Sequence, residues 1–185
     1  MFNERKVAQM AAFFLHQAGG ILPVLSLTKL LYLAEREAIN RFDEPMAGDR
    51  MVSMPHGPVL SQTLGLTNGE AESDGAWASL VAGRAGYEVE LAKGASANPE
   101  SLGALSDADI QVLSDVWKEF GHLDRFALRD RTHDICKEWK DPNGSSKPIR
   151  YQTVFLALGR DQSTAVEASK EIERGRFVSA ALARL

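Results

Sequence analysis

The segment from residue 26 to residue 41 constrains the fold more than any other part of the chain. It contains the run Lys29-Leu30-Leu31-Tyr32-Leu33-Ala34, in which apolar side chains cover more than one face of a helix. A helix with several apolar faces has to pack against neighbours on several sides. Ser26 is the expected N-cap, because a serine hydroxyl there accepts a hydrogen bond from an N–H group of the first turn. We therefore predict a largely buried helix within a helical domain.

Two other segments carry complete helix signals. Between Asn3, an expected N-cap, and Gly19-Gly20, an expected stop, apolar residues recur at spacings of three and four. The second segment lies between Ser106 and Gly121, and aspartates in its first turn stabilise a helix through their interaction with the helix dipole. Shorter helices are expected over residues 124–132, with Phe126 on the apolar side, and after an N-cap at Ser163.

Two short segments have the character of strands. Residues 51–54 are apolar and end at Pro55, and residues 87–91 alternate apolar and polar side chains. We expect these two segments to pair with each other. Pro58 is expected in the first turn of a short helix, and residues 65–75 form a polar loop. The predicted fold class is mainly α (α+β): a compact helical domain with a small two- or three-stranded antiparallel sheet.

Composition narrows the classes of function. The 185 residues include 21 basic and 25 acidic side chains, for a formal net charge of −4, and the basic residues form no cluster. Binding to nucleic acid therefore has no support from charge. Cys136 is the single cysteine, so no intramolecular disulfide can form. No segment approaches the roughly 20 apolar residues that a membrane span requires. We expect a cytoplasmic protein that has no contact with a membrane.

The residues that could perform chemistry are few. His133 and Cys136 lie three residues apart, but a structural zinc site needs four ligands and a catalytic thiol needs a base and an electropositive setting. Glu35 and Glu37 point to different faces of their helix and are expected to be solvated. The sequence contains no phosphate-binding loop and no metalloprotease motif. We expect no catalytic residues, no metal and no cofactor, so the chain is predicted not to be an enzyme.

Five short segments follow one another in a recognisable order and spacing: Lys29–Ala34, Pro55–Val59, Leu105–Asp107, Phe120–Leu123 and Leu128–His133. Together they resemble the SocA-like antitoxin family, also called the Panacea domain, and the resemblance covers roughly residues 5–142. Two positions depart from the family pattern: His56 stands where relatives have an aromatic residue, and Arg131 interrupts a Leu-Thr-His motif. We expect a SocA-like domain over residues 1–149 and, over residues 150–185, a C-terminal helical extension packed on the same domain.

The resemblance implies a non-enzymatic antitoxin that binds a cognate toxin and neutralises it by direct contact. In SocA itself the domain is a proteolytic adaptor that delivers its toxin to a ClpXP-type protease, so such a protease is a second implied partner. Three alternatives stay open. The chain could be a phage or mobile-element protein that binds a host factor, a hydrolase that uses His133 and Cys136, or a DNA-binding autoregulator.

The residues that carry the resemblance are expected to specify the fold, so contacts with a partner are sought elsewhere. Methionines adapt their shape to a partner, and aromatic residues often anchor interfaces. Trp77 fits either an exposed anchor or a core position. The C-terminal stretch from Phe177 to Leu185 could contact a partner or a second copy of the chain, as a homodimer. The candidate partner-binding residues are Met51, Met54, His56, Trp77 and Phe177.

Overall fold

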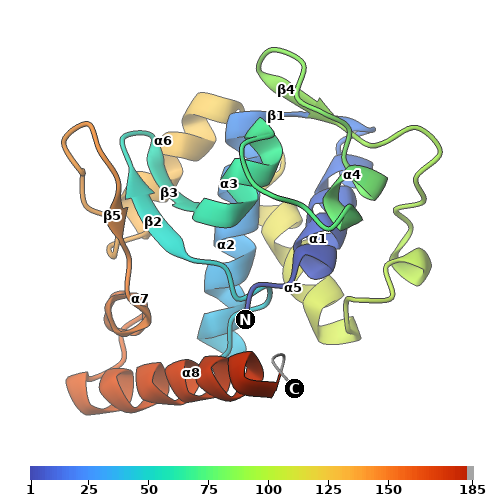
Figure 1. The fold of residues 1–185 in the computed structure, drawn as a ribbon. Coiled ribbons are helices and arrows are strands. Elements are labelled where there is room, and N and C mark those ends of the chain that lie inside the picture. Colours follow the sequence, from blue (N-terminus) through green and yellow to red (C-terminus); the bar gives the residue numbers. More distant parts are fainter. Residues whose placement is uncertain (183–185) are drawn as a thin grey trace.

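The computed structural model describes residues 1–182, and helix α2 (Val24–Phe42) runs through the middle of the molecule (Figure 1). It contacts helices on several sides, and also strand β3 (Gly57–Leu60) of a small sheet. The prediction of a buried helix is therefore confirmed. The fold is mainly α with a small antiparallel component, as expected, but that component forms two sheets and not one. The helices that contact α2 are α1 (Glu4–Gln17), α3 (Ser61–Asn68), α5 (Asp107–Phe120), α6 (Arg125–Ile135) and α7 (Tyr151–Ala157).

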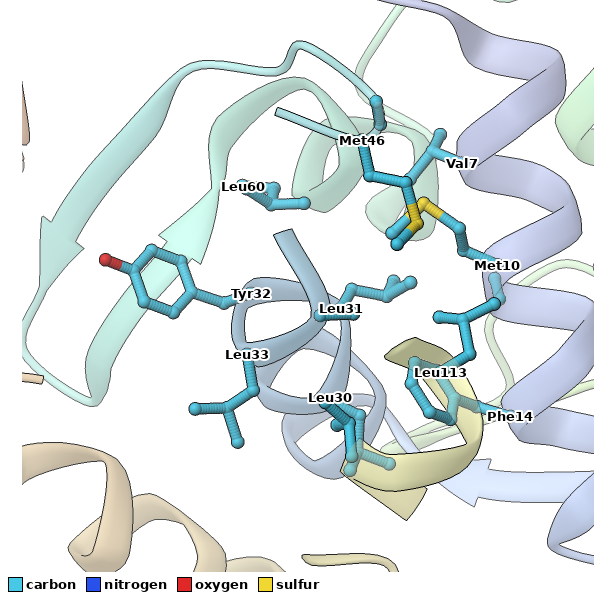
Figure 2. Close-up of a cluster of buried hydrophobic side chains, with 14 of the residues drawn as sticks. Val7, Met10, Phe14, Leu30, Leu31, Tyr32, Leu33, Met46, Leu60 and Leu113 are labelled. Carbon is cyan, nitrogen blue, oxygen red and sulfur yellow. The ribbon is translucent and has the colours of Figure 1, made fainter. Parts of the chain in front are cut away.

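Consecutive side chains of α2 point in different directions into the core. Figure 2 shows Leu31 directed toward Met10 of α1, while Tyr32 points away toward the other side of the helix. Helix α2 also contacts α5, and Leu30 and Leu113 of α5 belong to the same cluster of buried side chains. All of these side chains are buried. The apolar residues of this run thus fill the spaces between α2 and its neighbours. Because α2 has neighbours on several sides, it needs apolar residues on several faces.

Local capping explains where α1 and α5 begin. The N–H of Lys6 donates to the side-chain oxygen of Asn3 at 2.9 Å, as expected for an N-cap. Ser106 and Asp109 form a capping box, in which each side chain accepts from the backbone N–H of the other residue. Both predicted helix starts are confirmed.

Three expected helix starts were wrong. Helix α2 begins at Val24 and follows strand β1 directly, so Ser26 lies inside the helix. Pro58 belongs to a strand, where it pairs with Ser53, and α3 begins only at Ser61. Asp161 takes the place predicted for Ser163, because its carboxylate accepts the N–H groups of the first turn of α8 (Gln162–Leu182). The remaining helical elements are α4 (Ala76–Leu80) and a 3₁₀ turn, η1 (Pro99–Ser101).

The strands form two separate sheets. Strand β2 (Met51–Met54) pairs with β3 (Gly57–Leu60) on one side and β5 (Lys147–Pro148) on the other. Strand β4 (Glu88–Glu90) pairs with β1 (Ile21–Pro23) and not with β2, so the predicted pairing was wrong. The partner of β4 has three residues, too few for an alternating pattern to indicate it in the sequence. The loop expected over residues 65–75 is also shorter, because α3 extends to Asn68.

Glu35 is fully buried, contrary to the expectation that it is solvated. Its carboxylate accepts hydrogen bonds from the backbone N–H groups of Ala47 and Gly48, at 2.7 and 2.9 Å. The loop after α2 folds back on the helix, and its N–H groups need an acceptor there. Burial raises the pKa of Glu35 to about 7, although the two hydrogen bonds and Lys6 oppose the shift.

The two C-terminal helices, α7 and α8, extend the packing around α2. Helix α7 contacts α2, and α8 contacts α7. Figure 1 shows α8 at the end of the molecule that lies opposite β1 and β4. The buried residues of α8, namely Ala165, Ser169 and Ile172, all lie in its first half. Beyond them the side chain of Phe177 is 77% exposed, so the second half of α8 carries an open apolar surface.

Candidate partner-binding groove

Three segments far apart in the sequence meet at one junction. The ammonium group of Lys29 on α2 donates a 2.8 Å hydrogen bond to the carbonyl oxygen of Pro58 in the β2–β3 hairpin. A Cβ atom at Gly57 would lie 3.0 Å from Nζ of Lys29, 3.0 Å from Nε2 of His133 and 3.1 Å from Oγ1 of Thr132. Gly57 also has a φ of +98°, which side chains rarely tolerate. Glycine is therefore needed here both for backbone conformation and for close approach of α2 and α6.

Lys29 is fully buried at this junction. Desolvation lowers its pKa to about 7, because the charged form loses contact with water. None of the ion pairs among residues 1–182 includes Lys29. Burying an ammonium group that has a carbonyl oxygen as its acceptor costs folding free energy. The surroundings of Lys29 should therefore tolerate little change.

A stacked pair closes one side of the junction. The rings of His133 and Trp139 lie 4.1 Å apart and nearly parallel, and the indole N–H of Trp139 donates to the carbonyl oxygen of Met54. Nε2 of His133 is buried and has no hydrogen-bond partner among the described residues. Desolvation, together with the charges of Lys29 and Arg129, lowers the pKa of His133. The stack joins the end of α6 to the tip of the hairpin.

Cys136 is not placed for nucleophilic chemistry. Its side chain is fully buried, and burial raises the pKa of the thiol to about 12. The thiolate is the reactive form of cysteine, and at neutral pH it is scarce at such a site. Among residues 1–182, no group of three or more His, Cys, Asp or Glu side chains could hold a metal ion.

An open, mainly apolar groove of 520 Å³ lies beside the junction. Helix α2, the β2–β3 hairpin and α6 all reach the same end of the molecule (Figure 1), and each of them contributes residues to the groove lining. Two large side chains in its lining are exposed: Tyr87 is 74% exposed and Phe126 is 50% exposed. The lining residues are Pro23, Val24, Leu25, Thr28, Lys29, Met54, Pro55, His56, Val59, Leu64, Arg84, Tyr87, Arg125 and Phe126.

Each of the two exposed aromatic residues is accompanied by an arginine. The guanidinium carbon of Arg84 lies 6.0 Å from the ring centroid of Tyr87, and that of Arg125 lies 4.8 Å from the ring centroid of Phe126. Arg84 is held by hydrogen bonds to the carbonyl oxygen of Gly86 and the side-chain oxygen of Asn68. No acidic residue lines the groove, and within residues 1–182 neither arginine forms an ion pair.

The candidate contact residues from the sequence fall into three groups. Met54 and His56 line the groove. Met51 is only 3% exposed, so the expectation that it offers surface to a partner was wrong. Trp77 is 6% exposed and takes the core position, one of the two that its sequence left open. Helix α4, which carries Trp77, packs against α1, and the backbone N–H of Trp77 donates to the buried carboxylate of Glu4. Phe177 is exposed on α8, away from the groove lining, and the end of that stretch at Leu185 lies outside the described residues.

Sequence reasoning missed the two arginine–aromatic pairs. Phe126 was expected on the apolar, core-facing side of its helix, but it stands directly after the N-cap region of α6 and faces outward, while Leu128 is buried. Tyr87 is the first residue of the alternating segment and precedes β4. In both pairs the arginine stands shortly before the aromatic residue, one residue before Phe126 and three before Tyr87, near the start of an element. This spacing is the signal that could have indicated these positions.

The fold and the groove together define a mainly helical domain with an open apolar surface bordered by cations. The chain belongs to the SocA-like antitoxin family: the family model described as "Antitoxin SocA-like, Panacea domain" matches residues 27–140, more than half of the chain. This match includes the junction of Lys29, Gly57, Pro58, Thr132 and His133. No curated protein and no solved structure matches the chain. None of the helices within residues 1–182 is long and apolar enough to cross a bilayer.

Proposed function

We propose that this chain is an antitoxin that neutralises a cognate toxin by binding it directly, without chemistry of its own. The observation that carries the proposal is the match of residues 27–140 to the SocA-like antitoxin family. Those residues contribute most of the groove, which offers the apolar area and exposed aromatic side chains typical of protein interfaces.

The chemistry of the buried residues supports binding over catalysis. A thiol hydrolase would need Cys136 as an accessible thiolate beside a base, but its thiol is buried and its pKa is raised. His133, the nearest imidazole in the sequence, has its ring stacked on Trp139. These two residues are better explained as parts of the scaffold beneath the groove.

A second candidate function is that of a proteolytic adaptor, which has to contact a toxin and a protease at the same time. Helix α8 supports this candidate, because Phe177, Val178 and Leu182 are exposed there and none of the groove residues comes from α8. The chain therefore carries two separate apolar surfaces, as simultaneous binding of two proteins requires.

Co-expression tests the main proposal. The protein encoded by the neighbouring gene is expressed alone and together with this chain, while growth and co-purification are measured. We expect growth arrest from the neighbour alone, rescue by the wild-type chain, and no rescue by Leu31→Asp, which disrupts the core. A harmless neighbour, or rescue without association, would contradict the proposal. Repeating the rescue in cells without ClpXP separates the mechanisms: persistence indicates inhibition, and loss indicates delivery to the protease.

A further inference from the structure

We infer that the groove docks an acidic, apolar segment of the partner protein, with an apolar side chain on its floor and carboxylates at Arg84 and Arg125. This inference rests on the proposed function, because it takes the partner to be a protein. It goes further by naming the surface and the chemistry of the segment that binds there.

The floor of the groove indicates the apolar part of the segment. Leu25, Val59 and Leu64 line it, together with Met54. A volume of 520 Å³ is within the range of sites that enclose small ligands or a few side chains. Met54 at one side has a flexible side chain, which can adapt to the anchor that enters. The groove therefore fits one or two large aliphatic or aromatic side chains.

The charges at the rim indicate the acidic part. Arg84 lies in the loop between α4 and β4, and Arg125 is the first residue of α6. Both arginines are exposed and have no ion pair within residues 1–182. Asp124, next to Arg125, is committed through its carboxylate to the N–H groups of Phe126 and Ala127. A basic rim in a chain with a net charge of −4 favours a carboxylate-bearing segment through charge complementarity.

The arginine–aromatic pairs indicate where the binding free energy would concentrate. Tyrosine and arginine are enriched among interface residues whose truncation weakens binding most. Phe126 is approached by Arg125 and also by Arg129, whose guanidinium carbon lies 5.3 Å from its ring centroid. Arg129 is paired with Asp130, whereas Arg125 is available for a partner. Phe126 and Arg125 are therefore the expected centre of the contact.

A second copy of this chain fits the groove poorly. One exposed apolar segment of the chain is the end of α8 around Phe177, and Arg174 and Arg176 both lie just before that residue. Like charges would then face each other across the contact with Arg84 and Arg125, which disfavours association. Charge complementarity thus selects an acidic segment of another protein over homodimerisation through α8.

The probe for this inference is a library of random twelve-residue peptides, displayed on phage and selected against the full-length chain. We expect the enriched peptides to combine a large apolar residue with at least two Asp or Glu residues. The double variant R84E/R125E should bind a selected peptide at least about tenfold more weakly, a loss of roughly 1.4 kcal/mol. Raising the salt concentration from about 50 to about 500 mM should also weaken binding, because exposed charges are screened.

The matched control is R131E/R174E, which changes the net charge equally at two exposed arginines outside the groove lining. It should bind the peptide like the wild type, and thermal unfolding should show that both double variants are folded. Three results would overturn the inference. They are the selection of basic or uncharged peptides, equal peptide binding by R84E/R125E and the wild type, and a wild-type dimer in sedimentation that R84E/R125E dissociates.

The inference and the proposed function can fail separately. If the co-expressed neighbour is neutralised equally well by R84E/R125E, the groove inference fails while the antitoxin function stands. If no neighbour is toxic while acidic peptides still bind the groove, the function fails and the groove remains a docking site.

Discussion

Nζ of Lys29 and the carbonyl oxygen of Pro58 are joined by a buried 2.8 Å hydrogen bond that connects α2 to the β2–β3 hairpin. Lys29 is also part of the groove lining, so the same side chain belongs to the scaffold and to the candidate site. The hairpin carries Met54 and His56 at the groove wall. The hydrogen bond from Lys29 to Pro58 and that from the indole N–H of Trp139 to Met54 therefore both hold this wall in position.

The first prediction concerns the pH dependence of stability at Lys29. Its pKa is about 7 in the folded chain and about 10.5 when exposed, so between these values the unfolded state binds more protons and stability from this group rises with pH. The gain across the window is of the order of 2–5 kcal/mol. In Lys29→Met this component should vanish, which urea unfolding at several pH values would reveal.

Lys118→Met, at an exposed lysine, serves as the control and should keep the wild-type dependence on pH. If Lys29→Met and the wild type gained stability in parallel between pH 7 and pH 10, the buried ammonium would not be the source of the effect.

The second prediction concerns the glycine over the junction. Gly57→Ala combines a φ of +98° with a Cβ only 3.0 Å from two polar side-chain atoms, and it should reduce the free energy of unfolding by about 2–4 kcal/mol. Gly75→Ala isolates the backbone contribution, because Gly75 has a φ of +93° and open space around it. The control should lose only about 1–2 kcal/mol. Equal losses in chemical denaturation would show that the close approach of Lys29 and His133 is unimportant.

The third prediction concerns the buried carboxylate of Glu138. It accepts hydrogen bonds from the hydroxyl of Tyr32 at 2.9 Å and from Nε of Arg36 at 2.8 Å, which ties the end of α6 to α2. Because Glu138→Ala leaves a half-buried guanidinium without its partner, it should cost about 3–5 kcal/mol. The exposed pair of Glu37 and Arg41 is the matched comparison, and Glu37→Ala should cost less than about 1 kcal/mol.

Double-mutant cycles measure these two pairs directly. The coupling energy between positions 36 and 138 should exceed that between positions 37 and 41 by at least about 1 kcal/mol. Similar coupling energies in the two cycles would mean that burial does not strengthen the interaction between Arg36 and Glu138.

The sequence predicted those elements whose boundaries depend on local hydrogen bonds. The starts of α1 at Asn3 and α5 at Ser106 were correct, because an N-cap and its N–H partners lie within three residues of each other. The pairing of β4 was missed because its partner β1 is only three residues long. The burial of Glu35 was missed for a similar reason: its partners are N–H groups of an irregular loop twelve and thirteen residues away.

The candidate site was only partly predictable. Met54 was proposed because methionine adapts its shape to a partner, and His56 because it belongs to the same segment. Both residues line the groove. Whether an aromatic residue is exposed depends on what packs above it, and no local pattern encodes that packing. Trp77 is covered by α1 whereas Phe126 is open, although the second had the stronger sequence pattern of a core residue. The groove lining comes from five separate segments, so its existence depends on the whole tertiary fold.

The last prediction concerns Cys136 and separates a binding protein from a thiol enzyme. Burial raises the pKa of its thiol to about 12, so iodoacetamide at pH 8 should label the native chain far more slowly than the unfolded chain. Because this is the single cysteine, Cys136→Ala provides the blank for labelling.

Cys136→Ala removes one buried sulfur atom and should lower the free energy of unfolding by about 1–2 kcal/mol. Neutralisation of the toxic neighbour should persist at the wild-type level, since the thiol is fully buried and Cys136 is not among the residues that line the groove. Rapid labelling of the folded chain, or loss of neutralisation in a folded Cys136→Ala variant, would instead support catalysis by this residue.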